Sequence, residues 1–389
     1  MIAALSLPAP LSLVFRNPTH AFRLLLASVL LAATAEAQKN SDENALSFSG
    51  DVRLRFESDW DSQNSAGNAR DDRKRWRIRL RGNAGLQLSD QWSMGARLRT
   101  GDRDNQQSPH LTFASNSGGT DDVNLVFDRY FLSYQNAGIS GWFGRNSMPF
   151  WKQNEFFWDD DVTPTGIALS IRPNNRNSAI TTHWGAFLLP DGVYRLHGSM
   201  LSGQVKYDAP IAAGKLTLAA GLHNMSGKSG AENLRNRNGT RDYLIGVLGV
   251  QWTPNPDKLP LVLGLDVFEN FANYNGEDTA PFPASDADET SAYVFSLKYG
   301  SLSGPGSWQF AYAYAHVEAF AVNASYAQDD WFRFGSATQT DSSDYSGHEF
   351  RFTYSINNKV NVVTRLFLVD AISTIQDGNR FRIDLNCKF

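Results

Sequence analysis

The feature that most constrains the fold is a two-residue alternation of apolar and polar side chains over unusually long segments. Between Arg75 and Leu88 the alternation holds for fourteen residues, with Trp76, Ile78 and Leu80 on one face and arginines on the other. A period of two places successive side chains on opposite faces of a β-strand. Strands in soluble sandwiches run about five or six residues, whereas a tilted strand crosses a bilayer in about nine to eleven. The pattern therefore predicts strands that span a membrane.

Sixteen such segments follow one another, separated by connections that are alternately short and long. The predicted strands are 46–57, 73–88, 91–101, 123–136, 140–148, 163–172, 179–189, 198–208, 214–224, 240–252, 260–271, 289–299, 306–317, 346–356, 359–370 and 378–389. The tight turns are 89–90, 136–139 and 357–358, and the long polar stretches are 58–72, 102–122, 149–162, 225–239, 272–288 and 318–345. This asymmetry is typical of outer-membrane barrels. We therefore predict an all-β fold, a transmembrane antiparallel up-and-down β-barrel of sixteen strands with both termini on the periplasmic side.

The N-terminal segment has the layout of a secretory signal peptide. Two arginines precede the apolar run 24–33, and an Ala-Glu-Ala sequence ends at Ala37. The run is too short to span a bilayer comfortably, and an amphipathic or buried helix is the alternative. We predict cleavage near Ala37 and Gln38, so that 1–37 is the signal peptide and 38–389 is a barrel in the bacterial outer membrane.

The last predicted strand alternates to the end of the chain, where it finishes at Phe389. A barrel in lipid must close, because an open edge leaves backbone groups unsatisfied at several kcal/mol each. A terminal Phe on such a strand resembles the signal by which outer-membrane barrels are recognised for assembly. Cys387 shares its apolar face, and we interpret it as an apolar filler.

Aromatic residues near strand ends predict girdles at the two lipid–water interfaces. The residues concerned are Trp60, Trp92, Trp142, Trp151, Trp158, Trp252, Trp308 and Phe389. One strand gives no face assignment, because in 309–317 alanines alternate with Phe310, Tyr312 and Tyr314. Either of its faces could point toward lipid.

Composition excludes several other classes of protein. The chain has 36 Lys and Arg against 40 Asp and Glu, a net charge of −4 that gives no whole-chain indication of nucleic-acid binding. A single cysteine forms neither an intramolecular disulfide nor a Cys-rich zinc site. The histidines form no His-Glu-x-x-His pattern, and no Gly-x-Ser-x-Gly elbow is present. We expect no catalytic residue, no metal and no cofactor, so the protein is predicted not to be an enzyme.

The polar faces of the first strands are rich in arginine. A charge that faces lipid costs about 2–4 kcal/mol at the midplane, so these arginines should point into the lumen. We name the following set the basic wall: Arg53, Arg55, Arg75, Arg77, Arg79, Arg81, Arg97, Arg99 and Arg145. Inward positive charge is also predicted at Arg172, Lys206, Lys298, Arg351, Arg365 and Arg382.

Guanidinium groups beside water form a path for anions. The alternative is that the basic wall pairs with inward acids such as Glu57, Asp266, Glu349 and Asp384 and closes the lumen. The excess of arginine argues against full pairing, and sixteen strands leave an aqueous channel. The sequence therefore favours an open, arginine-lined pore.

The long loop 149–162 combines acids with five aromatic residues. Its carboxylates are Glu155, Asp159, Asp160 and Asp161. We expect a loop so rich in aromatics to fold against the barrel wall and narrow the pore, with its acids opposite the basic wall. Two alternatives remain: the loop covers the rim with a solvated Asp run, or the three adjacent carboxylates bind Ca²⁺.

The same region resembles the central motif of the bacterial outer-membrane "putative porin" family. The resemblance rests on 144–151, on 158–162 and on 165–169, with further similarity in the arginine strand, in 97–101 and in 128–130. It implies a Gram-negative outer-membrane barrel that conducts small solutes. A more distant likeness, to alginate-export barrels, rests on architecture and lumen charge.

The leading functional hypothesis is passive diffusion of small hydrophilic, preferably anionic, solutes through an arginine-lined aqueous pore. The alternatives are export of an anionic polysaccharide such as alginate and, in another class, a barrel adhesin or receptor that binds through its outer loops. The expected partners are outer-membrane lipid and lipopolysaccharide, the barrel-assembly machinery and small-molecule solutes. The sequence predicts no nucleic-acid partner and leaves a homotrimer open.

Overall fold

The computed structural model describes residues 46–389 except 65, 174–178, 213, 228–233, 235–239, 255–259, 278, 280–281, 332–341 and 374–376. The predicted signal peptide and cleavage site lie outside the described residues. Nearly all regular structure is strand, and a 3₁₀ helix of three residues occurs at Ala284–Asp286. Among the described residues, no helix is long and apolar enough to cross a membrane.

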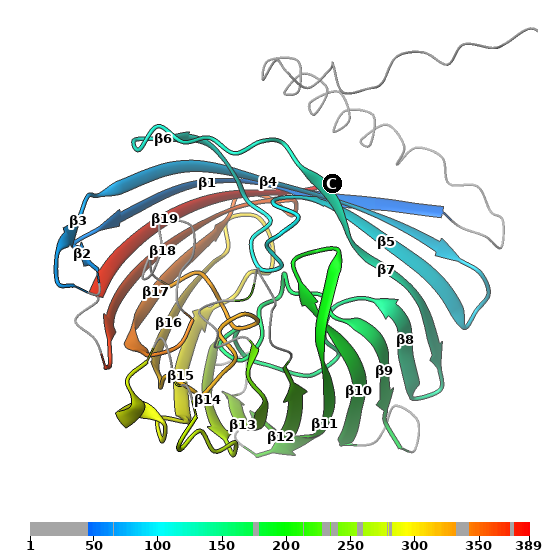
Figure 1. Ribbon diagram of the computed structural model, residues 1–389. Helices are drawn as coiled ribbons and strands as arrows, with labels where there is room; N and C mark the ends of the chain where they lie inside the picture. Colours follow the sequence, from blue (N-terminus) through cyan, green and yellow to red (C-terminus); the bar gives the residue numbers. More distant parts are fainter. Residues whose placement is uncertain are drawn as a thin grey trace, which may run out of the picture.

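The strands form one antiparallel sheet that closes into a barrel (Figure 1). They are β1 (Leu46–Trp60), β4 (Arg73–Gln87), β5 (Trp92–Thr100), β6 (Leu111–Ser115), β7 (Leu125–Asn136), β8 (Ile139–Arg145), β9 (Thr165–Ile171), β10 (Ile180–Asp191), β11 (Arg195–Ile211), β12 (Gly214–Ser226), β13 (Tyr243–Pro254), β14 (Leu261–Asn270), β15 (Ser291–Gly300), β16 (Trp308–Val317), β17 (Tyr345–Ser355), β18 (Val360–Ala371) and β19 (Asp377–Lys388). Two short strands, β2 (Ser62–Gln63) and β3 (Ala69–Arg70), form a separate hairpin.

Sixteen of these strands make the ring, which confirms the predicted fold class and strand number. Each predicted segment corresponds to one strand of the ring. The seventeenth strand of the sheet, β6, lies within the predicted loop 102–122 and pairs with β4 between Arg75 and Ile78. There it takes the place of β5, whose pairing with β4 ends at Arg81. A loop therefore supplies the strand that β5 is too short to provide.

The barrel closes between the first and last strands. β1 pairs with β4 along one edge and with β19 along the other, from Asp51 opposite Lys388 to Trp60 opposite Asn379. Beyond the ladder, the backbone N–H of Gly50 donates to the carbonyl of Phe389 at 2.9 Å, and Phe389 N–H returns a bond to Gly50 at 3.0 Å. From Gly50 to Asp59, β1 is therefore paired along both edges, as a bilayer requires.

The turn between β7 and β8 shows how the short connections are made. Asn136 pairs with Ile139, so Ala137 and Gly138 form a two-residue turn with positive φ at both positions, 35° and 93°. This backbone twist matches that of the adjoining strands in a tight hairpin. It requires a left-handed conformation that glycine adopts at little cost.

The structure settles the face assignment of β16. Its aromatic side chains point outward, where Trp308 and Phe310 are exposed, and its alanines line the interior, where Ala315 is fully buried. The outward rings continue onto β17, where the Tyr312 hydroxyl lies 2.9 Å from His348 Nδ1. The inner face of β16 therefore carries only small side chains at Ala311, Ala313 and Ala315.

The predicted aromatic girdle is right for some tryptophans and wrong for others. Trp92 and Trp308 are exposed on the outer face, as are Trp76 and Trp184. Trp142 instead packs on the buried Phe187, and Trp158 stacks on Tyr326 inside the barrel. Trp151 also lies inside, against Gly249 of β13. An aromatic ring suits a packed inner loop as well as an interface, so position along the sequence does not separate the two.

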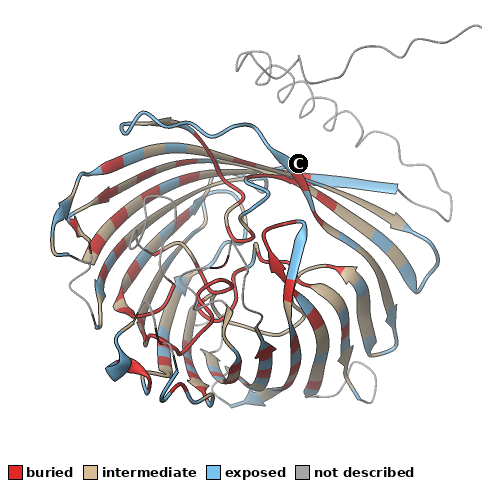
Figure 2. Ribbon diagram, in the orientation of Figure 1, coloured by how far each residue is buried: buried red, intermediate tan, exposed pale blue. Residues whose placement is uncertain are grey.

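Three inward-folded loops occupy much of the barrel interior, and Figure 2 shows their buried residues inside the ring of strands. They are 101–110, 146–164 and 318–331. Gln106 Nε2 donates to the carbonyl of Ser325 at 2.8 Å, and Asp159 N–H donates to the carbonyl of Tyr326 at 2.7 Å. The loops 146–164 and 318–331 share one apolar cluster with inward side chains of β9 to β18, which includes Phe156, Trp158, Tyr326, Trp331, Tyr345 and Phe367.

Candidate channel interior

Eight of the nine arginines of the basic wall lie on β1, β4 and β5, which are neighbours in the ring, and Arg145 is the last residue of β8. Arg53 lies opposite Arg79, Arg55 opposite Arg77, and Arg81 opposite Arg99. Like charges directly opposite one another destabilise a strand pair. This arrangement therefore needs carboxylates between the guanidinium groups.

Such carboxylates are present, and they come from strands and loops alike. Arg55 Nε lies 2.6 Å from Asp384 Oδ1 on β19, and Arg75 forms an ion pair with Glu57. Arg79 and Arg81 share Asp51 at 2.7 and 2.8 Å. Arg97 and Arg99 share Asp128 of β7.

Six of the nine arginines in the basic wall thus have a carboxylate within 4.0 Å. The sequence argued only against full pairing of the wall, and the pairing seen among the described residues is extensive but not complete. The sequence identified two of the partners, Glu57 and Asp384, but not Asp51 or Asp128. A buried ion pair satisfies charges that would otherwise be costly to desolvate, so the wall is fixed rather than mobile.

The remaining three arginines have other partners. Arg53 donates to Asn386 Oδ1 at 2.6 Å. Arg77 donates to Ser108 Oγ at 3.1 Å and to the His110 carbonyl at 3.3 Å. Arg145 donates to Thr163 and to the carbonyl of Val193. Within the described part of the chain, none of the three forms an ion pair with a carboxylate.

The loop 146–164 crosses the interior rather than covering the rim. The backbone N–H of Trp151 donates to Gln204 Oε1 of β11 at 2.8 Å. Gln153 and Asn154 donate to the two oxygens of Asp266 on β14, at 2.9 and 2.6 Å. The loop is therefore fastened to the wall opposite β4 before it returns to β9.

The four predicted loop carboxylates point to different places. Asp161 Oδ1 lies 3.1 Å from Arg81 Nη1 and Oδ2 lies 4.0 Å from Arg79 Nη1, so this residue faces the basic wall as expected. Asp159 is only 4% exposed and accepts the Asp161 N–H. Asp160 pairs with Lys152 at 2.7 Å, and Glu155 lines a cavity on the far side of the loop. The Asp run is not a uniformly solvated surface.

Burial and neighbouring charges affect two of these carboxyls in opposite directions. Burial and the adjacent Asp160 raise the pKa of Glu155 to about 8, although Lys152 opposes the change. Burial also acts to raise the pKa of Asp161, but Arg79 and Arg81 outweigh it and hold that pKa below its ordinary value. Among the described residues, no group of three or more His, Cys, Asp or Glu side chains is arranged to hold a metal ion.

The loop 318–331 adds an acid that the sequence analysis did not single out. Asp330 Oδ1 lies 2.6 Å from Arg382 Nη1 and 3.7 Å from Arg55 Nη1, and Oδ2 lies 3.2 Å from Arg365 Nη1. The three guanidinium groups hold the pKa of Asp330 well below its ordinary value despite its burial. This one side chain links β1, β18 and β19 to an inward loop.

A cavity of about 270 Å³ lies between the loop 146–164 and the inner faces of β15 to β18. Its charged lining comes from both sides: Lys152, Glu155, Asp160 and Asp330 from the loops, and Lys298, Glu349, Arg351 and Arg365 from the strands. Ala311 and Ala313 of β16 form part of the wall between them. We name this space the β16 cavity.

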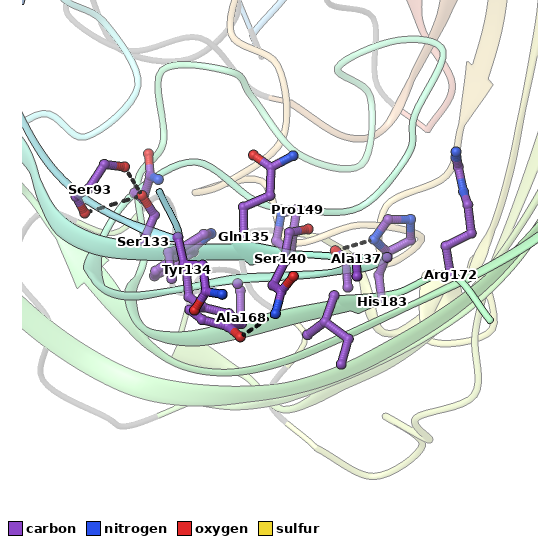
Figure 3. A pocket seen from close by; sticks show the side chains of 18 of the residues that line it. Ser93, Ser133, Tyr134, Gln135, Ala137, Ser140, Pro149, Ala168, Arg172 and His183 are labelled. Atoms are coloured by element: carbon purple, nitrogen blue, oxygen red, sulfur yellow. Dashed lines mark hydrogen bonds between the residues drawn. The ribbon is translucent and has the colours of Figure 1, made fainter. Parts of the chain in front are cut away.

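A larger cavity of about 910 Å³ lies at the end of the barrel where the short turns 88–91 and 137–138 are found (Figure 3). Serine, glutamine and asparagine side chains dominate its lining, and the charged residues among them are Asp90 and Arg172. The hydroxyls of Ser93 and Ser133 lie 2.7 Å apart, and Ser170 Oγ lies 2.7 Å from His183 Nδ1. This end of the lumen is therefore a polar, weakly charged vestibule.

The predicted assembly residue, Phe389, has a defined position at the barrel seam. A Cβ atom on Gly50 would lie 2.5 Å from the Phe389 ring and 2.6 Å from the Arg81 carbonyl. The terminal ring therefore covers the glycine of β1. Cys387, on the same strand, is a free thiol of intermediate exposure.

Comparison with known proteins supports an outer-membrane barrel of the porin kind. Residues 32–194 match the family model described as "putative porin". No curated protein matches the chain. The fold is similar to Pseudomonas putida OprB, with 11% identity and a TM-score of 0.55, over 88% of this chain and 94% of that one.

Two further solved structures show the same architecture. Salmonella typhi OmpF, in a complex with daunomycin, has 12% identity and a TM-score of 0.52 over 90% of this chain and 99% of that one. A mutant of the Rhodopseudomonas blastica porin has 12% identity and a TM-score of 0.51 over 89% and 100%. At these identities the likeness shows the fold alone. The resemblance predicted from the sequence is confirmed: residues 32–194 of the chain, whose described part forms a sixteen-stranded barrel, match the "putative porin" family.

Proposed function

We propose that the protein is an outer-membrane diffusion channel for small hydrophilic solutes that favours anions. The family match and the sixteen-stranded fold support a channel rather than an enzyme. A barrel of this size leaves an aqueous lumen.

The observation that carries the anion preference is the charge balance on the basic wall. Its nine arginines have six carboxylates within 4.0 Å, namely Asp51, Glu57, Asp128, Asp161, Asp330 and Asp384. Two of these acids are shared with arginines outside the set, because Glu57 also contacts Arg73 and Asp330 also contacts Arg365. Positive charge therefore remains in excess after pairing. A net excess of one sign of charge around an aqueous lumen raises the local concentration of ions of the opposite sign.

The inward loops weigh against the two alternative functions. Export of an anionic polysaccharide needs a continuous path wide enough for a polymer, whereas the loops 146–164 and 318–331 fill much of the lumen. An adhesin or receptor would hold its long loops outside, and these two are directed inward. Lipid and lipopolysaccharide contacts, the assembly machinery and a homotrimer remain predictions.

Swelling of proteoliposomes tests the proposed diffusion directly. Vesicles that contain the folded protein should swell in isotonic solutions of small neutral and anionic solutes, at rates that fall as solute size increases. A rate for acetate above that for an equal-sized amine supports the charge preference. Vesicles that swell no faster than protein-free vesicles in every solute would contradict a diffusion channel.

A further inference from the structure

We propose that solutes pass the narrow part of the lumen through the β16 cavity, and that Lys298 is the cation that contacts their anionic group. The inference rests on the proposed function, and it places the selective step away from the basic wall. Four observations support it.

The first observation is that five of the nine arginines of the basic wall are buried, namely Arg55, Arg79, Arg97, Arg99 and Arg145. Arg55 and Arg99 are each 1% exposed, and Arg79 is 5% exposed. Loop atoms lie against the wall as well: Asp330 contacts the buried Arg55, and the half-buried Arg81 and Arg77 contact Asp161 and the 101–110 loop. A guanidinium group held against protein on all sides acts on a solute through its field and not by contact.

The second observation is the size of the side chains on β16. Where β4 carries arginines toward the lumen, β16 carries Ala311 and Ala313. The outward aromatic residues of β16 show that this strand is not generally poor in large side chains. Small residues on the inner face alone leave space inside the barrel at this strand.

The third observation concerns the pairing of the cations around the cavity. Lys152 pairs with Asp160 at 2.7 Å, Arg351 with Glu349 at 2.7 Å, and Arg365 with Asp330 at 3.2 Å. Lys298 points inward from β15 and, within the described residues, has no carboxylate within 4.0 Å. Among the described residues it is therefore the cation of this cavity whose charge no carboxylate balances.

The fourth observation is the position of the loop 146–164 across from these strands. Its residues 152–155 form one side of the cavity, and Gln153 and Asn154 are fixed to Asp266. The opening is thus bounded by a fastened loop and a rigid sheet. A small carboxylate is the class of solute that fits a single accessible ammonium group in such a space.

The inference is tested first by Lys298→Gln, with Lys206→Gln as the matched control. Lys206 is paired with Asp208 and lies outside the β16 cavity. A unit charge about 4 Å from a solute in water changes its population about fivefold, so Lys298→Gln should lower the anion-to-cation permeability ratio by about that factor. Lys206→Gln should leave the ratio near that of the wild type.

A second test locates the path without removing a charge. In a Cys387→Ser background, Ala311→Cys should react with a negatively charged methanethiosulfonate reagent and lose conductance. Phe310→Cys, the next residue, points outward and should lose none. The test keeps the basic wall intact.

The outcomes separate the inference from the function on which it rests. A conducting, anion-selective wild type whose selectivity survives Lys298→Gln, or whose Ala311→Cys variant is not blocked, overturns the β16 path and leaves the channel standing. A wild type that is folded but does not conduct overturns the proposed function itself. Loss of selectivity in Lys298→Gln together with block of Ala311→Cys supports the inference.

Discussion

Asp161 Oδ1 lies 3.1 Å from Arg81 Nη1, and this ion pair joins the end of an inward loop to the basic wall. The same guanidinium group is bound from the other side by Asp51 on β1. One arginine of β4 thus connects the barrel wall, a neighbouring strand and the loop that narrows the lumen.

Removing the charge of Asp161 should loosen that connection. We expect Asp161→Asn to lower the free energy of unfolding by about 1.5–3 kcal/mol, the usual contribution of hydrogen bonds to charged groups. The variant should therefore lose its heat-resistant gel mobility at a lower temperature. Asp160→Asn is the control, because Asp160 is 68% exposed and pairs of that kind contribute about 0–1 kcal/mol. Equal shifts for the two variants would show that the Arg81 contact does not stabilise the loop.

Substitution within the basic wall should weaken anion preference through the field of the wall. In Arg77→Ala with Arg79→Ala, two positive charges are removed while Asp51 and Asp161 keep Arg81 as a partner. The reversal potential in a salt gradient should move toward zero, with an open conductance still present. An unchanged reversal potential would mean that the wall does not contribute to selectivity.

Anion preference should decrease as pH rises past about 8. Burial beside Asp160 raises the pKa of Glu155 to about 8, so this carboxyl gains a negative charge in the β16 cavity between about pH 7 and pH 9. The other charged groups of the cavity are Lys152, Asp160, Lys298, Asp330, Glu349, Arg351 and Arg365. Reversal potentials at pH 6 and pH 9 measure the effect.

Glu155→Gln should remove this pH dependence, and Glu277→Gln, at an exposed loop position, should keep it. The same pKa predicts the direction of the stability change. The folded state retains a proton on Glu155 that the unfolded chain releases near pH 4.5, so the contribution of Glu155 to stability is lost as pH rises from about 4.5 to about 8. If the reversal potential of Glu155→Gln changes with pH as much as that of the wild type, the pH dependence of anion preference belongs to another group.

The seam of the barrel predicts a contrast between two glycines that lie opposite one another. Gly50 of β1 pairs with Gly82 of β4. A Cβ on Gly50 meets the Phe389 ring and the Arg81 backbone carbonyl, whereas a Cβ on Gly82 meets nothing within 4 Å. Gly50→Ala should therefore lower the yield of folded barrel, measured as the heat-modifiable band, and Gly82→Ala should not. Equal yields would show that closure tolerates a displaced terminal ring.

The alternation of side chains was sufficient to predict the barrel, because a bilayer imposes one polarity on each face of every strand. It located all sixteen strands of the ring and the inward direction of the arginines on β4. It could not assign a face to β16, since alanine is accepted in lipid and in the lumen alike. It also missed β6, because five residues within a long polar stretch carry too little alternation.

The interior was predicted less completely, because its contacts join residues that are far apart in the sequence. The acids of the loop 149–162 were correctly expected inside the barrel, yet only Asp161 reaches the basic wall. Asp330 meets Arg382 only because the loop 318–331 folds inward, and that is decided by the packing of Tyr326 and Trp331. The alternation of apolar and polar side chains predicts a strand and its two faces. It does not predict which part of the barrel a loop packs against.

Single-channel recording in a planar bilayer with a KCl gradient tests the central claim most directly. Purified protein, shown to be folded by its heat-dependent gel mobility, should give a stable open conductance with a reversal potential of the sign set by chloride. Silence at every voltage, or a reversal potential of the sign set by potassium, would contradict an anion-preferring channel.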